Sequence, residues 1–183
     1  MYADDTSVRA ARDDYFAVNG FSEAGYTAAW ISLGKLGPIP LGFPNSASRK
    51  RAIPLHDLHH VATGFATSWV CEAEIAAWEI GGGCTDHWAA WILNAGAFGY
   101  GLVIAPRRTY RAFLRGRKSR TLYHSGWDAS LLDLSVAQLR DKLGLDRERP
   151  TSWRDRLAFA SWCVLVSCPT LLALAGGIAF ARS

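Results

Sequence analysis

The feature that most constrains this chain is a single interruption, at residues 64–68, in a helix-forming run that covers residues 55–80. A glycine there is a poor helix residue, and Thr67 or Ser68 would cap a new helix. The run predicts two helices joined by a tight turn, the second ended by the glycines at 81–83. No alternating run long enough for a strand is present. We therefore predict an all-α protein, an irregular helical bundle with a helical hairpin.

Glycine and proline divide the rest of the chain. Helix-like stretches occur up to Leu33, and the glycines and prolines of residues 34–54 leave no room for a long helix, which predicts an irregular segment. Pro54 suits the first turn of the next helix, because the N–H that proline lacks would be unpaired there. Residues 88–105 are uncharged and apolar, and residues 131–143 have leucine and valine at helical spacing.

Length and composition limit the class of protein. The chain has 183 residues, and half of it is hydrophobic whereas 20% is charged. We predict one domain over residues 1–150 and an apolar C-terminal segment over residues 151–183. The composition excludes a disordered, highly charged protein and favours contact with lipid or an apolar ligand. The cysteines form no Cys-x-x-Cys pair, and the polar start predicts no signal peptide, which favours a cytoplasmic location.

Three of the five histidines lie at positions 56, 59 and 60. Each helical residue advances by about 100°, so His56 and His60 lie on one face, with Asp57 between them within an arc of about 100°. A lone histidine usually packs in a core or lies on the surface. His, Asp and His at i, i+1 and i+4 instead favour a metal site. His59 points elsewhere, and we predict that it packs or faces solvent.

The turn supplies a fourth ligand. If the chain reverses there, His60 and Glu72 each lie one helical turn from the bend, whereas an uninterrupted helix would separate them by about 18 Å. Two imidazoles and two carboxylates suit a divalent metal ion, either Zn or a redox-active ion such as Fe, Mn or Co, with positions open for substrate. Glu74, Glu79 and Asp86 are predicted to be solvated helix residues.

A longer pattern surrounds these positions and reads Pro54-Leu-His-Asp-Leu-His-His-Val, then Thr63-Gly-Phe, then Cys71-Glu-Ala-Glu-Ile-Ala-Ala-Trp. It resembles the metal motif of the ubiquinone biosynthesis family known as coenzyme Q protein four. That motif is His-Asp-x-x-His, eleven residues, then Glu. In this sequence the positions of the motif are filled by His56, Asp57, His60 and Glu72.

The resemblance covers about half of the chain, from residue 53 to residue 145, and includes Asn94. Family members often carry glycine where this chain has Cys71, and Asp or Asn where it has Ser68. Neither departure removes a ligand, but both bear on the turn and on hydrogen bonds around the metal. The segment after Thr151 has no counterpart.

The resemblance implies an enzyme of quinone head-group synthesis. The family is associated with decarboxylation of a polyprenylated 4-hydroxybenzoate-type intermediate, with oxidative replacement of the carboxylate by hydroxyl, and with organising other ubiquinone-biosynthesis proteins. The four motif residues would then be metal ligands rather than proton carriers. A non-catalytic lipid-binding scaffold, in which the metal holds the hairpin together, is the alternative. An HD-type phosphohydrolase is disfavoured, because that class spreads its ligands over distant helices.

The run Arg107–Arg120 holds seven basic side chains and no acid. We interpret it either as a solvated helix face or as a site that docks on anionic lipid head groups, where each basic residue contributes about 1 kcal/mol. No nucleic-acid-binding motif accompanies the charge, so no nucleic-acid partner is predicted.

The segment Leu157–Ala181 has no charged residue. As a helix it would span about 37 Å, against about 30 Å for the hydrocarbon core of a bilayer. We predict a transmembrane or interfacial anchor, with a buried hairpin as the alternative. A spanning helix would place the main domain on the cytoplasmic side of the membrane, because of the basic run. Residues 88–105 are predicted to form a bundle-core or tail-binding helix, with a second span as the alternative.

Overall fold

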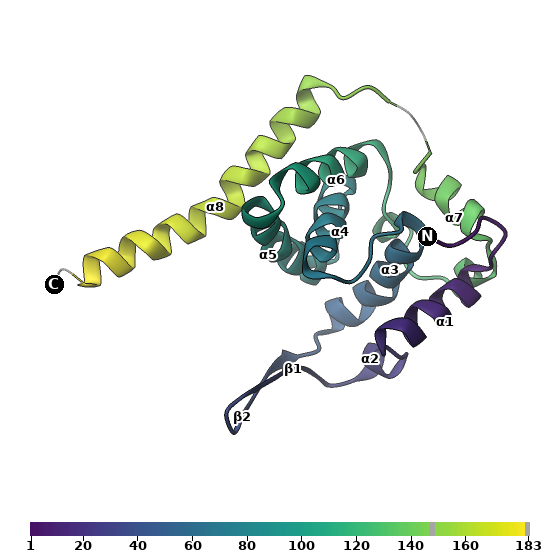
Figure 1. Ribbon diagram of the computed structural model, residues 1–183, viewed down its shortest axis with the longest axis horizontal. Helices are drawn as coiled ribbons and strands as arrows, with labels where there is room; N and C mark the ends of the chain where they lie inside the picture. Colours follow the sequence, from purple (N-terminus) through teal and green to yellow (C-terminus); the bar gives the residue numbers. More distant parts are fainter. Residues whose placement is uncertain (147–148, 182–183) are drawn as a thin grey trace.

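The computed structural model describes residues 1–146 and 149–181, apart from the side chains of residues 33–36, 40, 41, 43 and 169–181. Eight α-helices make up most of this part of the chain, which confirms its mainly helical character (Figure 1). In chain order the elements are α1 (Val8–Asn19), α2 (Ala24–Thr27), β1 (Trp30–Leu36), β2 (Ile39–Pro44), α3 (Ala47–Thr63), α4 (Trp69–Gly82), α5 (Trp88–Ile104), α6 (Pro106–Lys118), the 3₁₀ turns η1 (Leu122–His124) and η2 (Ala129–Asp133), α7 (Val136–Leu143) and α8 (Trp153–Ala181).

The predicted helical hairpin is present as α3 and α4. After α3 the chain turns at Gly64, whose φ of 75° lies in the left-handed region that glycine adopts without steric cost. Ser68 caps α4, because its hydroxyl accepts a hydrogen bond from the backbone N–H of Cys71 at 3.4 Å. Gly83 follows the last turn of α4 with a φ of 94°. The reversal, the cap at Ser68 and the glycine end of the second helix are confirmed.

The start of α3 differs from the prediction. The helix begins at Ala47, with Pro54 in its interior instead of in its first turn. Ser46 caps it by accepting a hydrogen bond from the N–H of Arg49 at 3.2 Å. No glycine or proline lies between this cap and Pro54, so the helix forms ahead of the proline. The proline then removes only the one hydrogen bond that its missing N–H would make.

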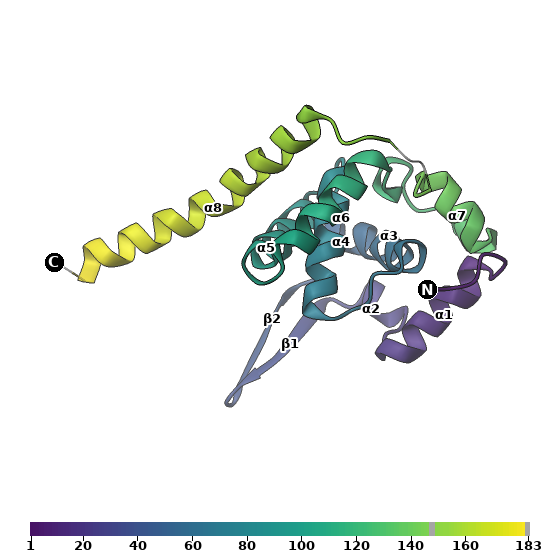
Figure 2. The same ribbon diagram turned by 45° about the horizontal axis from the view of Figure 1, so that its top comes forward.

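A β-hairpin occupies part of the segment that was predicted to be irregular, so the prediction of no strand is wrong here. β1 and β2 pair in antiparallel register from Trp30 opposite Pro44 to Leu36 opposite Ile39, and Gly37 supplies a φ of 60° at the turn. The prolines of β2 are tolerated because each strand of a two-stranded ribbon has an unpaired edge. The hairpin projects from the helical body (Figure 2).

The core is centred on α4, which packs against both α5 and α6. The backbones of α4 and α6 touch: a Cβ on Gly116 would lie 2.0 Å from the carbonyl oxygen of Trp78, and one on Gly81 would lie 2.4 Å from that of Phe113. Only glycine permits this approach. The rings of Trp78, Phe98 and Phe113 are buried and are the largest side chains of the core.

The helix predicted over residues 131–143 is divided in the structure. Leu131 and Leu132 are buried in η2, and α7 begins only after Ser135. The hydroxyl of Ser135 accepts from the N–H of Gln138 at 3.1 Å, and the Gln138 side chain accepts from the N–H of Ser135 at 2.8 Å. This capping box starts a new helix at the point where the leucine spacing predicts an uninterrupted one. Gly144 ends α7 as predicted.

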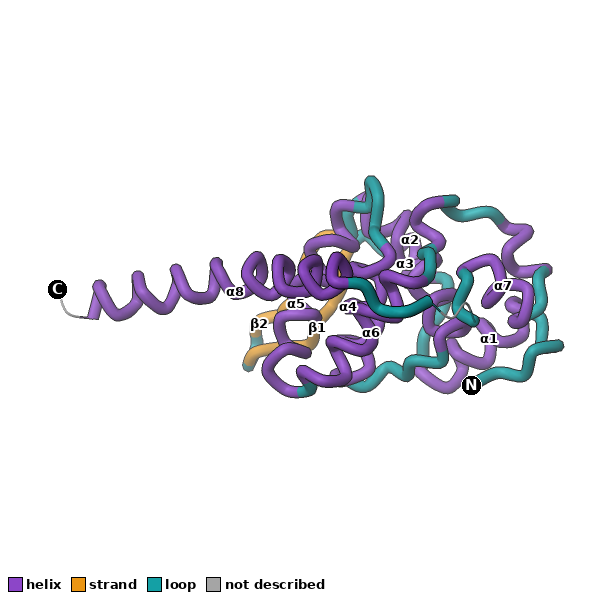
Figure 3. Tube along the Cα trace, turned by 90° about the horizontal axis from the view of Figure 1, so that it is seen from above, coloured by secondary structure: helices purple, strands orange, loops and turns teal. Residues whose placement is uncertain are grey.

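α8 crosses α5 and α6, and its second half extends away from the rest of the chain (Figures 1 and 3). Trp162 stacks on Trp91 of α5, with ring centroids 5.5 Å apart. At its start, Asp155 is buried and accepts hydrogen bonds from Ser152 and Arg149. Among the helices of the described residues, none combines the length and the apolar character that crossing a membrane requires. About half of the predicted anchor, residues 169–181, has its side chains outside the described part.

Candidate metal centre

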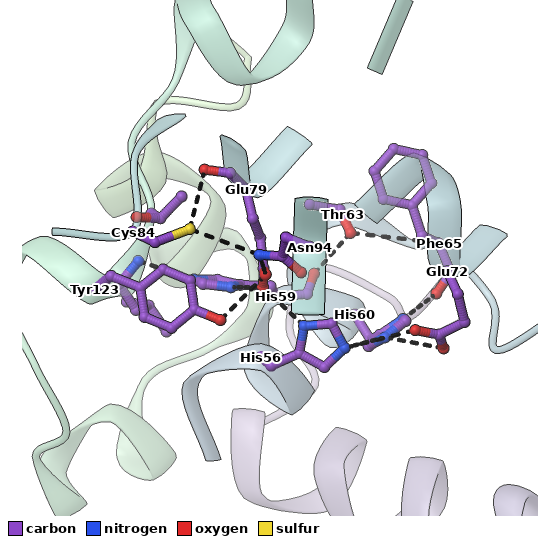
Figure 4. Close-up of polar contacts among 12 residues, drawn as sticks. His56, His59, His60, Thr63, Phe65, Glu72, Glu79, Cys84, Asn94 and Tyr123 are labelled. Carbon is purple, nitrogen blue, oxygen red and sulfur yellow. Dashed lines mark hydrogen bonds and ion pairs between the residues drawn. The ribbon is translucent and has the colours of Figure 1, made fainter. Parts of the chain in front are cut away.

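The α3–α4 hairpin brings three predicted ligands together (Figure 4). His56 and His60 lie one turn apart on α3, and their Nε2 atoms are 3.1 Å apart. Glu72, in the first turn of α4, places its carboxylate 3.7 Å from the Nε2 atom of His56 and 3.5 Å from that of His60. Ligand atoms on one tetrahedral zinc ion are about 3.3 Å apart. The outer cluster, as we call His56, His60 and Glu72, therefore has nearly the spacing that one ion requires.

The hydrogen bonds of His60 leave its Nε2 atom free to bind a metal. Its Nδ1 lies 2.9 Å from the carbonyl oxygen of Phe65, which can only accept, so Nδ1 carries the proton. Burial, together with the nearby charge of His56, lowers the pKa of His60 to about 4. His60 is thus neutral, with its Nε2 lone pair directed at His56 and Glu72.

His56 is oriented in the same way by a different partner. Its Nδ1 donates to the carboxylate of Glu79, with 2.8 Å between nitrogen and oxygen, and its Nε2 faces the outer cluster. Burial disfavours the charged ring, but the carboxylates of Glu79 and Glu72 raise the pKa of His56 well above its usual range. The two Nε2 atoms and the Glu72 carboxylate all present lone pairs to one another, with no hydrogen between them, so they require a cation. Either a proton on His56 or a bound metal ion satisfies this requirement.

Glu79 is the centre of a second cluster and is fully buried, so the prediction that it is a solvated helix residue is wrong. Its Oε1 accepts from the Nδ1 atoms of His56 at 2.8 Å and His59 at 2.6 Å. Its Oε2 accepts from the Asn94 amide at 2.6 Å and the Tyr123 hydroxyl at 3.1 Å. We call Glu79, His59, Asn94 and Tyr123 the inner cluster. Despite burial, the two histidines hold the pKa of Glu79 well below its usual range.

His59 packs in the core, one of the two places predicted for it, and has a defined tautomer. Its Nε2 accepts a hydrogen bond from the backbone N–H of Leu122 at 2.8 Å, so its proton lies on Nδ1 and points at Glu79. The ring is completely buried, and burial lowers its pKa. His59 is therefore a neutral donor that ties η1 to α4.

Asp57, the fourth predicted ligand, is not part of the outer cluster. Its carboxylate accepts a hydrogen bond from the hydroxyl of Tyr26 at 2.7 Å. Burial raises the pKa of Asp57 to about 6. The residue lines the same cavity as His56 and Glu72. The structure thus gathers three of the four predicted ligands and leaves Asp57 in the adjoining wall.

The other two acids that were predicted to be solvated have different fates. Glu74 is buried and forms a two-pronged ion pair with Arg108 of α6, at 2.9 and 2.5 Å, so the prediction is wrong for it. Asp86 is exposed, as predicted, with 74% of its side chain accessible, but it lies in the turn between α4 and α5 and not in a helix.

The inner cluster had a signal in the sequence. Glu79 follows Glu72 by seven residues, or nearly two turns, so both carboxylates lie on the same face of one helix. That face meets α3, where His56 contacts both of them. Only the family resemblance included Asn94. No pattern pointed to Tyr123, which reaches Glu79 from a turn remote in the chain.

A cavity of about 280 Å³ opens beside the outer cluster. Its lining combines apolar residues of α3 and α5 with polar groups and an aromatic wall, among them Arg49, Asp57, Asn94, Tyr15 and Tyr123. A second, more apolar hollow of about 560 Å³ shares Glu72, Leu93 and Ala97 with it and continues to Trp69 and Tyr100. A path lined by apolar side chains thus leads from the outer cluster to the surface between α4 and α5.

The predicted basic run forms α6 and the residues after it, and part of it stabilises the fold. Arg108 pairs with Glu74, Arg115 donates to the carbonyl of Thr63 at 3.2 Å, and Arg117 pairs with Asp155 at 3.3 Å. Other members of the run, Arg107, Arg111 and Arg120, are exposed. The run is thus partly structural and partly a solvated face.

No protein-family model matches this chain, and neither a curated protein nor a solved structure is significantly similar to it. The family resemblance remains a prediction from the motif residues. The assignment of function therefore rests on the outer cluster, the cavity beside it and that motif.

Proposed function

We propose that this chain is a metal-dependent enzyme of ubiquinone (coenzyme Q) biosynthesis, which decarboxylates a polyprenylated 4-hydroxybenzoate-type intermediate at the ring carbon that bears the carboxylate. One observation carries the proposal. The Nε2 atoms of His56 and His60 and the carboxylate of Glu72 converge at the spacing of a single ion, beside a cavity that continues into an apolar groove.

The ligand chemistry indicates which metals the site would hold. Two imidazoles and one carboxylate suit Zn, Fe, Mn or Co, and a two-histidine, one-carboxylate set with open positions is typical of iron enzymes that use dioxygen. When bound, the ion would supply Lewis-acid or redox chemistry at the substrate's carboxylate or phenolic oxygen. His56, His60 and Glu72 would hold it. Asp57 would line the substrate cavity next to them.

The cavity and groove suit an aromatic acid with an isoprenoid tail. The ring would occupy the cavity of about 280 Å³, where Arg49 places a cation among the lining residues. The tail would follow the groove past Leu93 to Trp69 and Tyr100. With dioxygen as the oxidant, the balanced change consumes the carboxylic acid, dioxygen and water. It yields the phenol, carbon dioxide and hydrogen peroxide.

The test combines metal analysis with quinone profiling. We expect the purified chain to hold stoichiometric divalent metal and His60→Ala to lose it. A strain that lacks the gene should accumulate a carboxylated quinone precursor, which the native gene but not His60→Ala removes. Asp86→Asn, at an exposed acid outside the cluster, is the control and should behave as native. A metal-free protein whose His60→Ala variant restores quinone synthesis would overturn the proposal.

A non-catalytic scaffold at the membrane surface is the second candidate, and the outer face of α5 favours it. Trp88, Ile92 and Val103 on that helix are 54%, 63% and 82% exposed. Exposed apolar surface of this kind marks contact with lipid or another protein, and the exposed Arg107 and Arg111 would favour anionic lipid. The partners would be the cytoplasmic face of the membrane and other ubiquinone-biosynthesis proteins.

Vesicles discriminate the two candidates. The scaffold requires co-sedimentation with anionic vesicles that Val103→Glu abolishes, and requires that His60→Ala loses quinone synthesis only if it also loses vesicle binding. The enzyme requires that His60→Ala still binds the vesicles yet does not restore quinone synthesis.

A further inference from the structure

We propose that Glu79 is the positioning residue of the metal centre, and that it acts through His56 by fixing which ring nitrogen faces the ion. This inference rests on the proposed metal centre. Glu79 is not one of the predicted ligands, and its carboxylate contacts only one residue of the outer cluster, His56, at 2.8 Å. Its function would be to keep the proton of His56 on Nδ1, so that the Nε2 lone pair faces His60 and Glu72.

The carboxylate of Glu79 is held rigidly (Figure 4). Two ring nitrogens donate to Oε1, and an amide and a hydroxyl donate to Oε2, at distances between 2.6 and 3.1 Å. These four bonds fill the four lone-pair positions of a carboxylate. Because the group is also fully buried, it has no freedom to turn toward another acceptor or toward water. The hydrogen bond to this fixed carboxylate therefore also fixes the orientation of the His56 ring.

Only an anionic acceptor fits this position. The proton of His59 must point at Glu79, because the N–H of Leu122 already occupies the other ring nitrogen of His59. The hydrogen-bond partners around Glu79 thus all donate, and a glutamine would bring its own N–H₂ against at least one of them. When that N–H₂ lies on the Oε1 side, the strain is relieved if His56 changes tautomer, accepts at Nδ1 and carries its proton on Nε2. That tautomer cannot bind the metal.

Charge gives the same result. A divalent ion bound to two neutral imidazoles and the Glu72 carboxylate retains one positive charge. The buried carboxylate of Glu79, linked to the site by the ring of His56, supplies the compensating negative charge. Groups that orient a metal-bound histidine in this way typically change metal affinity by 10- to 100-fold when they are replaced.

Glu79→Gln tests the inference, with Glu74→Gln as the matched control on the same helix. Both residues are buried carboxylates, but Glu74 pairs with Arg108 and is not in contact with the outer cluster. The probe is Co²⁺, whose visible spectrum reports its coordination. We expect Glu79→Gln to weaken Co²⁺ binding by about 10- to 100-fold and to alter the spectrum, and Glu74→Gln to remain within about twofold of native.

A second readout follows the proton itself. In the Zn²⁺-loaded native protein, the Nδ1 proton of His56 should give a strongly downfield NMR resonance, separate from that of His59, since each ring donates to the buried carboxylate of Glu79. Glu79→Gln should remove this resonance. Native Co²⁺ affinity and spectrum in Glu79→Gln would overturn the inference, and so would a retained resonance.

If Glu79→Gln does not fold, Tyr123→Phe tests the same inference. It removes one donor to Oε2 and leaves the charge in place, so we expect Co²⁺ affinity to fall by about threefold. Unchanged affinity in that variant would overturn the inference. Failure of the metal centre itself is distinguishable, because the native chain would then bind no Co²⁺. If the native chain binds Co²⁺ tightly and the variants bind it equally well, only the role of Glu79 is rejected, and the metal centre stands.

Discussion

The two carboxylates Glu72 and Glu79 lie on one face of α4, and each meets two histidines of α3, yet they make opposite kinds of site. Glu79 contacts His56 and His59 and has 1% of its side chain exposed. Glu72 contacts His56 and His60 and has 32% of its side chain exposed. The residue types are the same. What differs is the balance of donors and acceptors around each carboxylate.

In the inner cluster every acceptor position of Glu79 has a donor, so the group is complete without a ligand. In the outer cluster two lone pairs and a carboxylate face one another, and only a cation satisfies them. A histidine–carboxylate pair can therefore be structural or ligand-binding. Which of the two it is depends on the hydrogen bond made by the ring nitrogen that does not face the carboxylate. His56 belongs to both arrangements and connects them.

The largest expected effect is a difference in folding stability between variants of the inner and the outer cluster. In the metal-free protein, Glu79→Ala should lower the free energy of unfolding by about 3–5 kcal/mol, because it leaves buried donors without an acceptor. Glu72→Ala should change it by no more than about 1 kcal/mol, since the Glu72 carboxylate is partly in water. Urea denaturation followed by circular dichroism measures both. Equal losses would mean that the two clusters are not distinct in kind.

The next effect is stabilisation by metal. Zn²⁺ at 100 times its dissociation constant should stabilise the native chain by about 2.7 kcal/mol, because it binds only the folded state. Glu72→Ala should abolish this gain, and EDTA should reverse it in the native protein. Thermal denaturation with and without Zn²⁺ provides the measurement. A gain that persists in Glu72→Ala would place the ion elsewhere.

The pH dependence of stability should reverse when metal binds. In the metal-free protein the pKa of His56 is raised above its usual value of 6.5, so its stabilising contribution is complete below pH 6.5 and disappears as the pH rises through the folded-state pKa. Above pH 6.5, the melting temperature should therefore fall with rising pH. With Zn²⁺ bound it should rise over the same range, since the ion competes with that proton. Parallel curves with and without Zn²⁺ would contradict the exchange of proton for metal.

The smallest effect concerns Asp57. Because its carboxylate accepts from Tyr26 and lies outside the outer cluster, Asp57→Asn should change Zn²⁺ affinity by less than about threefold. Titration calorimetry is sufficient to measure this. A loss as large as that of Glu72→Ala would restore Asp57 as a ligand, and would require its side chain to turn away from Tyr26 when metal binds.

Local patterns predicted the hairpin and the meeting of three candidate ligands, His56, His60 and Glu72. Gly64 and Ser68 define the reversal through backbone conformation and capping, which depend on a few neighbouring residues. Helical spacing then places His56 and His60 on one face. The β-hairpin escaped prediction because its pairing depends on a glycine turn between two short segments, and because prolines interrupt the brief apolar alternation of β2.

The roles of Asp57 and Glu79 could not be predicted in the same way. A helical spacing gives the direction of a side chain but not the group that it meets, and both residues are paired with partners from other elements: Tyr26 from α2, and Asn94 and Tyr123 from α5 and η1. The spacing of Glu79 from Glu72 puts both on one face of α4 but does not give the partners of Glu79. Its complete burial follows only from the packing of these elements on α3 and α4.

The sequence by itself determined that two helices reverse at Gly64 and carry His56, His60 and Glu72 to one level, because caps and helical period act over a few residues. Only the tertiary structure decided which acid joins those histidines and which one supports them from behind. That choice depends on how many donors reach each carboxylate from distant parts of the chain, and on whether water can reach it too.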